Sequence, residues 1–297
     1  APVLATVSDV SFDEDQSGSL SVSGSDVDGD NLTFSLGNDG ANGSVIIDGS
    51  VATYTPNQNY NGDDSFTFIV SDGELTDTAT VTLTVNAVND APVLATVSDV
   101  SFDEDQSGSL SVSGSDIDGD DLSYSISGGT DITASLTGSD ISFSAPADYN
   151  GSETFTVSIS DSELTDSQNI IVTVLAVNDA PVLSSIGNKS LDEDNELNIL
   201  LSSIDIDDDP LSYTVSEGLQ ITASLSDNNL TFTPDENFNG SEIFTVTATD
   251  GLLEDLEIFT ITINPVNDAP VLATVSDVSF DEDQSGSLSV SGSDIDG

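Results

Sequence analysis

The feature that most constrains this chain is an internal repeat with a period of about 90 residues. The tripeptide Ala-Pro-Val recurs at Ala1, Ala91, Ala180 and Ala269, residues 1–26 are identical to 91–116, and residues 269–297 are identical to 91–119. The chain therefore divides into three complete units, 1–90, 91–179 and 180–268, and a fourth unit, 269–297, that is cut short. This period predicts small domains in series, and we expect the natural protein to continue beyond the last residue.

Each unit has the pattern of a β-protein. Apolar residues alternate with Ser and Thr at period two, as in Phe66, Phe68 and Val70, and no window has the periodicity of a helix. About seven such segments in each unit are separated by turns rich in Gly, Asn and Asp. Seven short antiparallel strands in about ninety residues are typical of an immunoglobulin-like β-sandwich. The sequence predicts an all-β fold of tandem sandwiches and leaves the strand order open.

The composition excludes several classes of function. The chain has 55 Asp and Glu residues against a single basic residue, Lys189, so binding to nucleic acid or to an anionic membrane surface is opposed by charge. It has no Cys and no His, which removes the usual ligands of zinc, a thiol nucleophile and any Ser-His pair. No apolar run is long enough to cross a membrane as a helix. The available chemistry is that of oxygen atoms, which suit calcium and magnesium.

The acidic motifs gather at the two ends of each predicted unit. If successive strands reverse direction, the loop between the second and third strands and the turn after the sixth strand lie at the top, while the end of the first strand lies at the bottom beside the linker. In the first unit the top residues are Asp26, Asp28 and Asp72. When units are stacked, the bottom of one, the linker and the top of the next would form three junctions. They would gather Glu14, Asp64, Asn89, Asp90, Asp116, Asp118 and Asp161 at the first, Glu104, Glu153, Asn178, Asp179, Asp205, Asp207 and Asp250 at the second, and Glu193, Glu242, Asn267, Asp268, Asp294 and Asp296 at the third.

Carboxylates gathered in this way require a cation. Each pair of like charges at about 4 Å repels by roughly 4 kcal/mol at an effective dielectric constant of about 20. Calcium accepts six to eight oxygen ligands in flexible geometry, whereas magnesium demands a stricter octahedron and keeps its water. The pattern predicts calcium bound at the junctions, with magnesium as the second choice. The alternative that these Asp, Asn and Gly residues only form turns is weakened by their recurrence at matching ends of three units.

The same motifs resemble a known family. The Asp-x-Asp-Gly-Asp loop, the segment Phe66-x-Phe68-x-Val70-x-Asp72-Gly73 and the linker Val88-Asn89-Asp90-Ala91-Pro92 are similar to the cadherin repeat, and more closely to the cadherin-like tandem repeats of giant bacterial surface adhesins of the RTX type. The resemblance implies that the linker Asn-Asp pair, the paired Asp residues of the top loop, the Asp after the sixth strand and the acid after the first strand bind calcium. The Asp-Arg-Glu motif of animal cadherins is replaced here by Gly62-Asp63-Asp64 and its counterparts, which leaves that ligand position open.

These observations predict a binding and spacing role for the chain. The resemblance implies an extracellular or cell-surface extender, made stiff by calcium between neighbouring repeats, that holds a terminal binding domain away from the cell. The alternatives are a subunit of an extracellular filament or matrix, in which copies of the chain associate, and a module that itself binds carbohydrate or another cell. Paired carboxylates can hydrolyse glycosides, but the chain has no Trp, Arg or His to build an aromatic cleft or to separate two pKa values, so we expect no enzyme.

Overall fold

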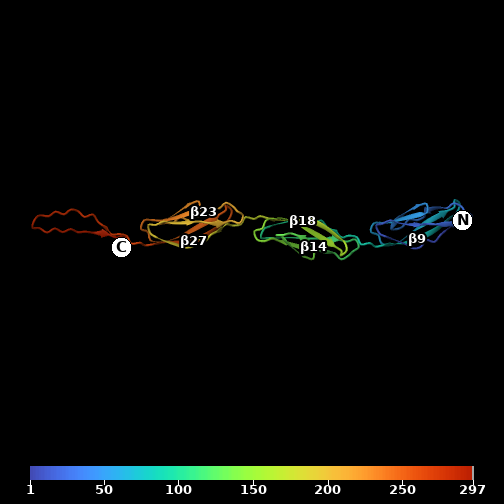
Figure 1. The fold of residues 1–297 in the computed structure, drawn as a ribbon, viewed down its shortest axis with the longest axis horizontal. Helices are drawn as coiled ribbons and strands as arrows, with labels where there is room; N and C mark the ends of the chain where they lie inside the picture. The colour runs from blue at the N-terminus through green and yellow to red at the C-terminus, as the bar shows by residue number, and fades with distance from the viewer. Residues whose placement is uncertain (296–297) are drawn as a thin grey trace. The chain divides into compact units, whose positions relative to one another are not determined.

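The computed structural model describes residues 1–295, which form three β-sandwiches followed by a short strand pair. They belong to two compact units, Ala1–Leu175 with the first two sandwiches and Ala176–Gly297 with the third. Strands β9, β18 and β27 in Figure 1 are the last strands of the three sandwiches. Among the described residues there is no helix of the length and apolarity needed to cross a membrane.

The first sandwich contains nine strands. The alternation of apolar and hydroxyl side chains places one face of each strand in the core. The strands are β1 (Pro2–Leu4), β2 (Val10–Asp13), β3 (Gly18–Ser21), β4 (Gly24–Asp26), β5 (Thr33–Leu36), β6 (Gly43–Asp48), β7 (Val51–Pro56), β8 (Gly62–Ser71) and β9 (Thr76–Asn86). A four-stranded sheet in the order β2-β9-β8-β5 faces a three-stranded sheet in the order β3-β7-β6, and β1 pairs with β4.

The second and third sandwiches repeat this topology. Their four-stranded sheets have the orders β11-β18-β17-β14 and β20-β27-β26-β23, and their three-stranded sheets have the orders β12-β16-β15 and β21-β25-β24. The second contains β10 (Val93–Leu94), β11 (Val100–Asp103), β12 (Ser107–Ser111), β13 (Gly114–Ser115), β14 (Ser123–Gly128), β15 (Thr133–Thr137), β16 (Asp140–Ser144), β17 (Gly151–Ser160) and β18 (Thr165–Leu175). The third contains β19 (Val182–Leu183), β20 (Lys189–Asp192), β21 (Leu197–Leu200), β22 (Ser203–Ile204), β23 (Ser212–Val215), β24 (Ile221–Ser226), β25 (Asn229–Pro234), β26 (Gly240–Thr249) and β27 (Glu254–Asn264).

Each sandwich has a hydrophobic core of its own. In the first, Phe66, Phe68 and Tyr54 are fully buried, and Phe143 with Phe155 and Phe232 with Phe244 form edge-to-face pairs in the other two. The described residues from Ala269 to Ile295 form only the pair β28 (Val271–Leu272) and β29 (Gly292–Ser293), and their side chains are almost all exposed. Three closed cores confirm the all-β prediction and supply the strand order that the sequence left open.

The first strand of each sandwich is split between two partners. Its upper part, β1, pairs antiparallel with β4, and its lower part, β2, pairs parallel with β9. Because β2 runs parallel to β9, both strands end at the same end of the sandwich, where Asp13 lies beside Asn86. This arrangement places the acid after the first strand next to the linker.

Candidate metal centres

Glu14 forms the lower half of the first junction. Its backbone N–H donates to the carbonyl of Asn86 at 3.0 Å, and its side-chain Oε1 accepts from the N–H of Val88 at 2.8 Å. These two bonds turn the carboxylate toward the linker, where only 2% of Glu14 is exposed. Its second oxygen, Oε2, is buried and has no hydrogen-bond partner. The parallel β2–β9 pairing therefore delivers a buried carboxylate oxygen to the point where the chain leaves the sandwich.

The linker binds directly to the top of the second sandwich. The side-chain amide of Asn89 donates to Asp161 Oδ2 at 2.9 Å, and the backbone N–H of Asp90 donates to Asp118 Oδ2 at 2.8 Å. The turn after β17 holds Asp161, whose Oδ1 accepts from the N–H groups of Glu163 and Leu164 at 2.7 and 2.6 Å. The Asn89 amide first, and the Leu164 N–H next, hold the pKa of Asp161 below its usual value.

Asp116 occupies the loop between β13 and β14. Its Oδ1 accepts from the N–H groups of Asp118 and Gly119 at 2.9 and 3.1 Å, so the loop closes around this carboxylate. Its Oδ2 is buried without a hydrogen-bond partner, as is Asp90 Oδ2. A cleft of about 450 Å³ at this point is lined by both residues, together with Asp15, Gln58 and Asn59 of the first sandwich.

The electrostatics of Asp90 show how closely the acids of the two sandwiches gather. Burial raises the pKa of Asp90, and the negative charges of Asp15, Asp118, Glu14 and Asp116 raise it further. Two of those charges belong to the first sandwich and two to the second. Buried polar atoms in folded proteins are almost always paired, so three orphaned carboxylate oxygens in one cluster are unusual. Oxygen ligands, negative charge and missing partners together fit a hard divalent cation.

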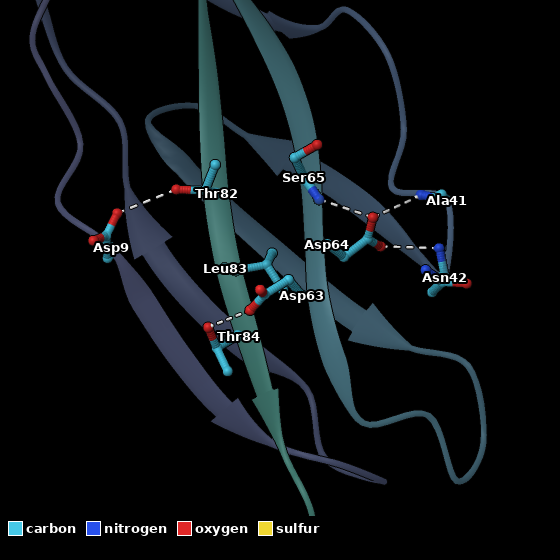
Figure 2. Close-up of a pocket in the computed structure, with 9 residues that line it drawn as sticks. All are labelled: Asp9, Ala41, Asn42, Asp63, Asp64, Ser65, Thr82, Leu83 and Thr84. Atoms are coloured by element: carbon cyan, nitrogen blue, oxygen red, sulfur yellow. Dashed lines mark hydrogen bonds between the residues drawn. The ribbon is translucent and has the colours of Figure 1, made fainter.

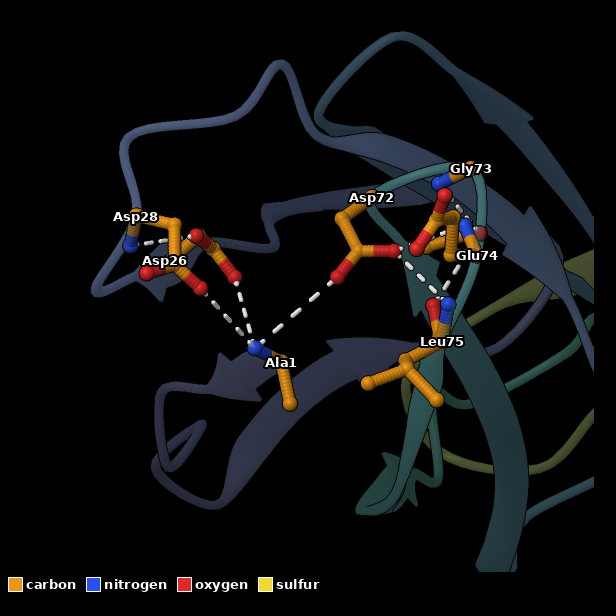
Figure 3. Close-up of polar contacts among 8 residues, drawn as sticks. Ala1, Asp26, Asp28, Asp72, Gly73, Glu74 and Leu75 are labelled. Atoms are coloured by element: carbon orange, nitrogen blue, oxygen red, sulfur yellow. Dashed lines mark hydrogen bonds and ion pairs between the residues drawn. The ribbon is translucent and has the colours of Figure 1, made fainter.

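The top of the first sandwich gathers its three predicted acids around one amino group. The amino-terminal ammonium of Ala1 lies 3.2 Å from Asp26 Oδ2, 3.8 Å from Asp28 Oδ2 and 3.9 Å from Asp72 Oδ2 (Figure 3). The side chains of Asp26 and Asp72 are only 1% and 7% exposed. Burial alone would raise the pKa of Asp26, but the Asp28 N–H and the ammonium outweigh it and lower that pKa. The three predicted top residues are therefore brought together in the first sandwich.

The same bonds recur at the top of the third sandwich. Asn178 donates to Asp250 Oδ2 at 2.9 Å, and the Asp179 N–H donates to Asp207 Oδ2 at 2.8 Å. Asp205 is only 9% exposed; its Oδ1 accepts from the N–H groups of Asp207 and Asp209, and its Oδ2 is buried without a hydrogen-bond partner. The predicted linker and top residues are therefore brought together in this sandwich as they are in the second.

The lower halves of the other two predicted sites have the geometry of Glu14. Glu104 is buried, and its N–H donates to the Leu175 carbonyl at 2.9 Å. Glu193 is also buried; its Oε1 accepts from the Val266 N–H at 2.6 Å, and its Oε2 has no hydrogen-bond partner. Asn267 donates to the Asp268 carbonyl at 2.8 Å, and Asp268 and Asp294 line a cleft of about 570 Å³. The remaining predicted residue of that site, Asp296, lies outside the described residues.

Three predicted ligands have a different role in the structure. The Asp64 carboxylate is buried, and its oxygens accept from the N–H groups of Ala41, Asn42 and Ser65 at 2.8 to 3.0 Å (Figure 2). The Tyr54 hydroxyl also donates to Asp64 Oδ2, at 2.8 Å. Asp64, Glu153 and Glu242 were predicted as junction ligands, and the structure gives each of them backbone N–H donors from a loop of its own sandwich. Glu153 accepts from the N–H groups of Thr130, Asp131 and Ile132, and Glu242 accepts from those of Leu219 and Gln220.

The sequence analysis missed two groups of residues near the sites. A third Asp in each top loop lies with the other two, so that one oxygen from each falls within 4.8 Å of the rest; these are Asp30, Asp120 and Asp209. The second group comes from the loop between β7 and β8, where the N–H of Asn59 donates to Asp15 Oδ1 at 3.1 Å. The alternating Asp-x-Asp-x-Asp spacing was the available signal for the first group. Gln58 and Asn59, not Gly62-Asp63-Asp64, are the residues of this segment that line the cleft at the first junction.

Comparisons with known proteins agree with the repeat and with the fold. The profile of a bacterial Ig domain matches residues 1–84, 89–173 and 178–264. Chitinase A of Pseudoalteromonas piscicida is 31% identical over 124 residues, which cover 40% of this chain and 15% of that enzyme. Mouse cadherin-23 EC22-24 is similar in structure with a TM-score of 0.52 and 18% identity, covering 89% of this chain and 99% of that one. PcdhgB3 EC1-4 also has a TM-score of 0.52, with 13% identity over 89% of this chain and 76% of its own.

Proposed function

This chain belongs to the bacterial Ig domain family, and from that premise we propose that it is an extender region of a long extracellular adhesin or surface protein, made stiff by calcium at its domain junctions. The observation that carries the proposal is the set of three buried, unpartnered carboxylate oxygens of Glu14, Asp90 and Asp116 at the first junction. These residues come from the end of one sandwich, the linker and the start of the next. A cation bound by all three would fix the linker.

Calcium is the ion that this ligand set fits best. Glu14, Asp90, Asp116 and Asp118 supply carboxylate oxygens, and backbone carbonyls of the linker are close enough in sequence to complete a set of six to eight. Calcium supplies positive charge and a flexible oxygen-coordination shell, whereas magnesium would demand an octahedron and retain water. Asn89 and Asp161 position the linker by bonding to each other. In the absence of the ion, repulsion from Asp15, Asp118, Glu14 and Asp116 acts on Asp90 and favours separation of the two domains.

The places of the specialised residues support the proposed spacer role. The outer face of β9 carries Thr78, Thr80 and Thr82, whereas the unpartnered acids lie at the domain ends. A module that bound a ligand through its own faces would place its distinctive side chains there. The proposal includes no catalytic activity for this chain, and an adhesin of the RTX type at a bacterial surface is its specific form.

The similarity to chitinase A favours a second candidate function, a spacer within a polysaccharide hydrolase. The match to chitinase A covers 15% of that enzyme, so repeats of this kind occur in a protein that carries other domains as well. The same calcium-dependent spacer would then separate the domains of a secreted polysaccharide hydrolase. The two candidates share the junction chemistry and differ in what the spacer connects, which the sequence on either side of this segment in the whole protein would decide.

Small-angle scattering of the full chain tests the calcium-dependent stiffness. We expect the maximum dimension to be greatest in about 5 mM calcium, because extracellular modules bind calcium at roughly 10⁻⁴ to 10⁻³ M. It should fall in chelator and recover when calcium is restored. Asp116→Asn should reduce the effect of calcium, and Asp48→Asn, which removes one exposed charge from the end of β6, is the matched control. A dimension that chelation leaves unchanged would contradict the proposal.

A further inference from the structure

The split first strand determines how each sandwich bears tension. In the second sandwich, residues 100–103 of β11 pair parallel with residues 172–175 of β18, and the equivalent pairs are β2 with β9 and β20 with β27. The chain enters a sandwich through the upper half of the split first strand, continues into the first strand of each of these pairs, and leaves through the second. Pulling on the two ends therefore slides the two strands along each other and loads their hydrogen bonds together. Opening requires release of the segment that joins the two halves of the first strand.

In the second sandwich one side chain binds that joining segment to the last strand. Gln168 of β18 donates through Nε2 to the carbonyls of Leu94 and Ala95 at 2.9 and 3.2 Å, and its Oε1 accepts from the Val97 N–H at 3.1 Å. Asp99 adds a further bond, in which its Oδ1 accepts from the Ile171 N–H at 2.8 Å.

Glu257 has the same role at the equivalent position of the third sandwich. Its carboxylate accepts from the N–H groups of Ile186 and Gly187 at 2.5 and 2.8 Å and from the Ser185 hydroxyl at 3.1 Å. Asn188 adds a bond to the Thr260 N–H at 2.9 Å. An amide in one repeat and a carboxylate in the next thus bind the same backbone segment, although the two side chains differ in charge.

The first sandwich lacks this bond because Ala79 occupies the position. Its joining segment keeps the bond from the Leu4 N–H to Asp77 Oδ2 at 2.9 Å, which the other two sandwiches share. Asp9, the counterpart of Asp99, accepts only from the Thr82 side chain, at 3.1 Å. This part of the first sandwich is also less tightly packed than its counterparts. Leu4 is half-buried, whereas the equivalent residues Leu94 and Leu183 are only 3% and 8% exposed.

We propose that the side chain at positions 79, 168 and 257 sets the tension at which each repeat opens, so that the first repeat opens before the second and third. This inference rests on the proposed function, since a spacer between a surface and a bound target is a protein under tension. Opening under force is governed by the unfolding rate, so a bond that must break on the way to the transition state slows it. The weakest repeat would then lengthen the spacer while its neighbours stay folded.

Single-molecule force measurements on the full chain, held at both ends at constant force, test the inference. The three complete repeats should give one short-lived and two longer-lived unfolding steps. We expect Ala79→Gln to lengthen the short lifetime about tenfold, as the net contribution of one or two hydrogen bonds implies. Gln168→Ala and Glu257→Ala should each convert one long-lived step into a short-lived one. These two variants test the inference even if the Gln side chain of Ala79→Gln does not fit at position 79.

Asn169→Ala is the matched control, because Asn169 is the neighbour of Gln168 in β18 and its side chain bonds to Thr156 of the adjacent strand. The lifetimes of this variant should equal those of the parent chain. Lifetimes unchanged by both Gln168→Ala and Glu257→Ala would overturn the inference. The bonds lie inside single repeats, so the order should persist in chelator, and its loss there would also overturn the inference. The scattering experiment tests the calcium proposal separately, because these substitutions leave the junction acids in place.

Discussion

At the scale of single residues, carboxylates of the same type perform two opposite tasks in this chain. Asp64 is buried with all its oxygens occupied by backbone N–H groups and a tyrosine hydroxyl, whereas Asp90 and Asp116 are oriented so that one oxygen of each is left without a donor. The first arrangement stabilises a fold without a metal. The second is unfavourable until a cation is bound, which makes it suited to a junction that responds to calcium.

Asp64 should therefore matter for folding irrespective of calcium. We expect Asp64→Asn to lower the free energy of unfolding of the first repeat by about 1–3 kcal/mol, because the new amide donors would face the N–H groups of Ala41 and Asn42. Thermal unfolding in calcium and in chelator measures this. Asp63→Asn is the control, since the Asp63 side chain is exposed and accepts only from Thr84. If Asp64→Asn destabilised the first repeat in only one of the two calcium conditions, Asp64 would be a calcium ligand and not only a structural residue.

At the scale of elements, one acidic side chain near the start of β8, β17 or β26 holds the loop that leads into the preceding hairpin, β6–β7, β15–β16 or β24–β25. In the second repeat this is Glu153 on β17, which accepts from the N–H groups of residues 130–132 ahead of β15. The bonds from Thr130 and Asp131 lower the pKa of Glu153 below its ordinary value of 4.5, against the effect of burial. The loop is thus attached to the sheet by a charge that acid can remove.

The direction of that pKa shift predicts how the second repeat responds to acid. A carboxylate with a lowered folded-state pKa contributes stability above its unfolded value, and this stability is lost as the pH falls through the folded value. We expect the second repeat to lose stability below about pH 4.5 in part through Glu153, and Glu153→Gln to make its unfolding less dependent on pH. Hydrogen exchange of residues 130–132 measures the loop directly.

Glu217→Gln, at an exposed position of the third repeat, is the control for that experiment and should leave the exchange of residues 130–132 unchanged. Equal pH dependence in the parent chain and in Glu153→Gln would show that the carboxylate does not attach the loop.

At the scale of the whole molecule, the net charge of −54 acts on every domain, while the candidate metal centres act only at particular points. Salt screens the repulsion between these negative charges, with a Debye length of about 3 Å at 1 M. Sodium ions do not, however, provide the coordination that a divalent cation would supply at the candidate metal centres. Calcium and sodium chloride should therefore differ in their effect on a chain of linked repeats.

We expect 1 M sodium chloride in chelator to restore only part of the maximum dimension that calcium gives, because screening weakens repulsion without fixing the linker. Scattering in calcium, in chelator and in chelator with salt compares the three conditions. Asp90→Asn in the same series should shift the calcium midpoint upward, since it removes a charge from the first junction. Full recovery in salt alone would make the chain an acidic spacer whose stiffness does not depend on calcium.

Sequence alone determined the repeat, the all-β sandwiches and the sorting of acids to the two ends of each domain. These follow from local rules, since alternation with period two fixes which face of a strand is buried, and chain reversal fixes the end at which each loop lies. Asn89, Asp90, Asp118 and Asp161 were among the residues predicted to gather at the first junction. In the structure Asn89 is bonded to Asp161, and Asp90 is bonded to Asp118.

Only the tertiary structure decided which carboxylates have protein partners. The sequence pattern places both Asp64 and Glu14 near the lower end of the first sandwich. In the structure Asp64 faces a loop that donates hydrogen bonds to it, whereas Glu14 faces the linker. The contacts of Gln168 likewise span more than 70 positions in the chain. Pattern and spacing place a side chain on a face and at an end, but its partners come from segments that only folding brings beside it.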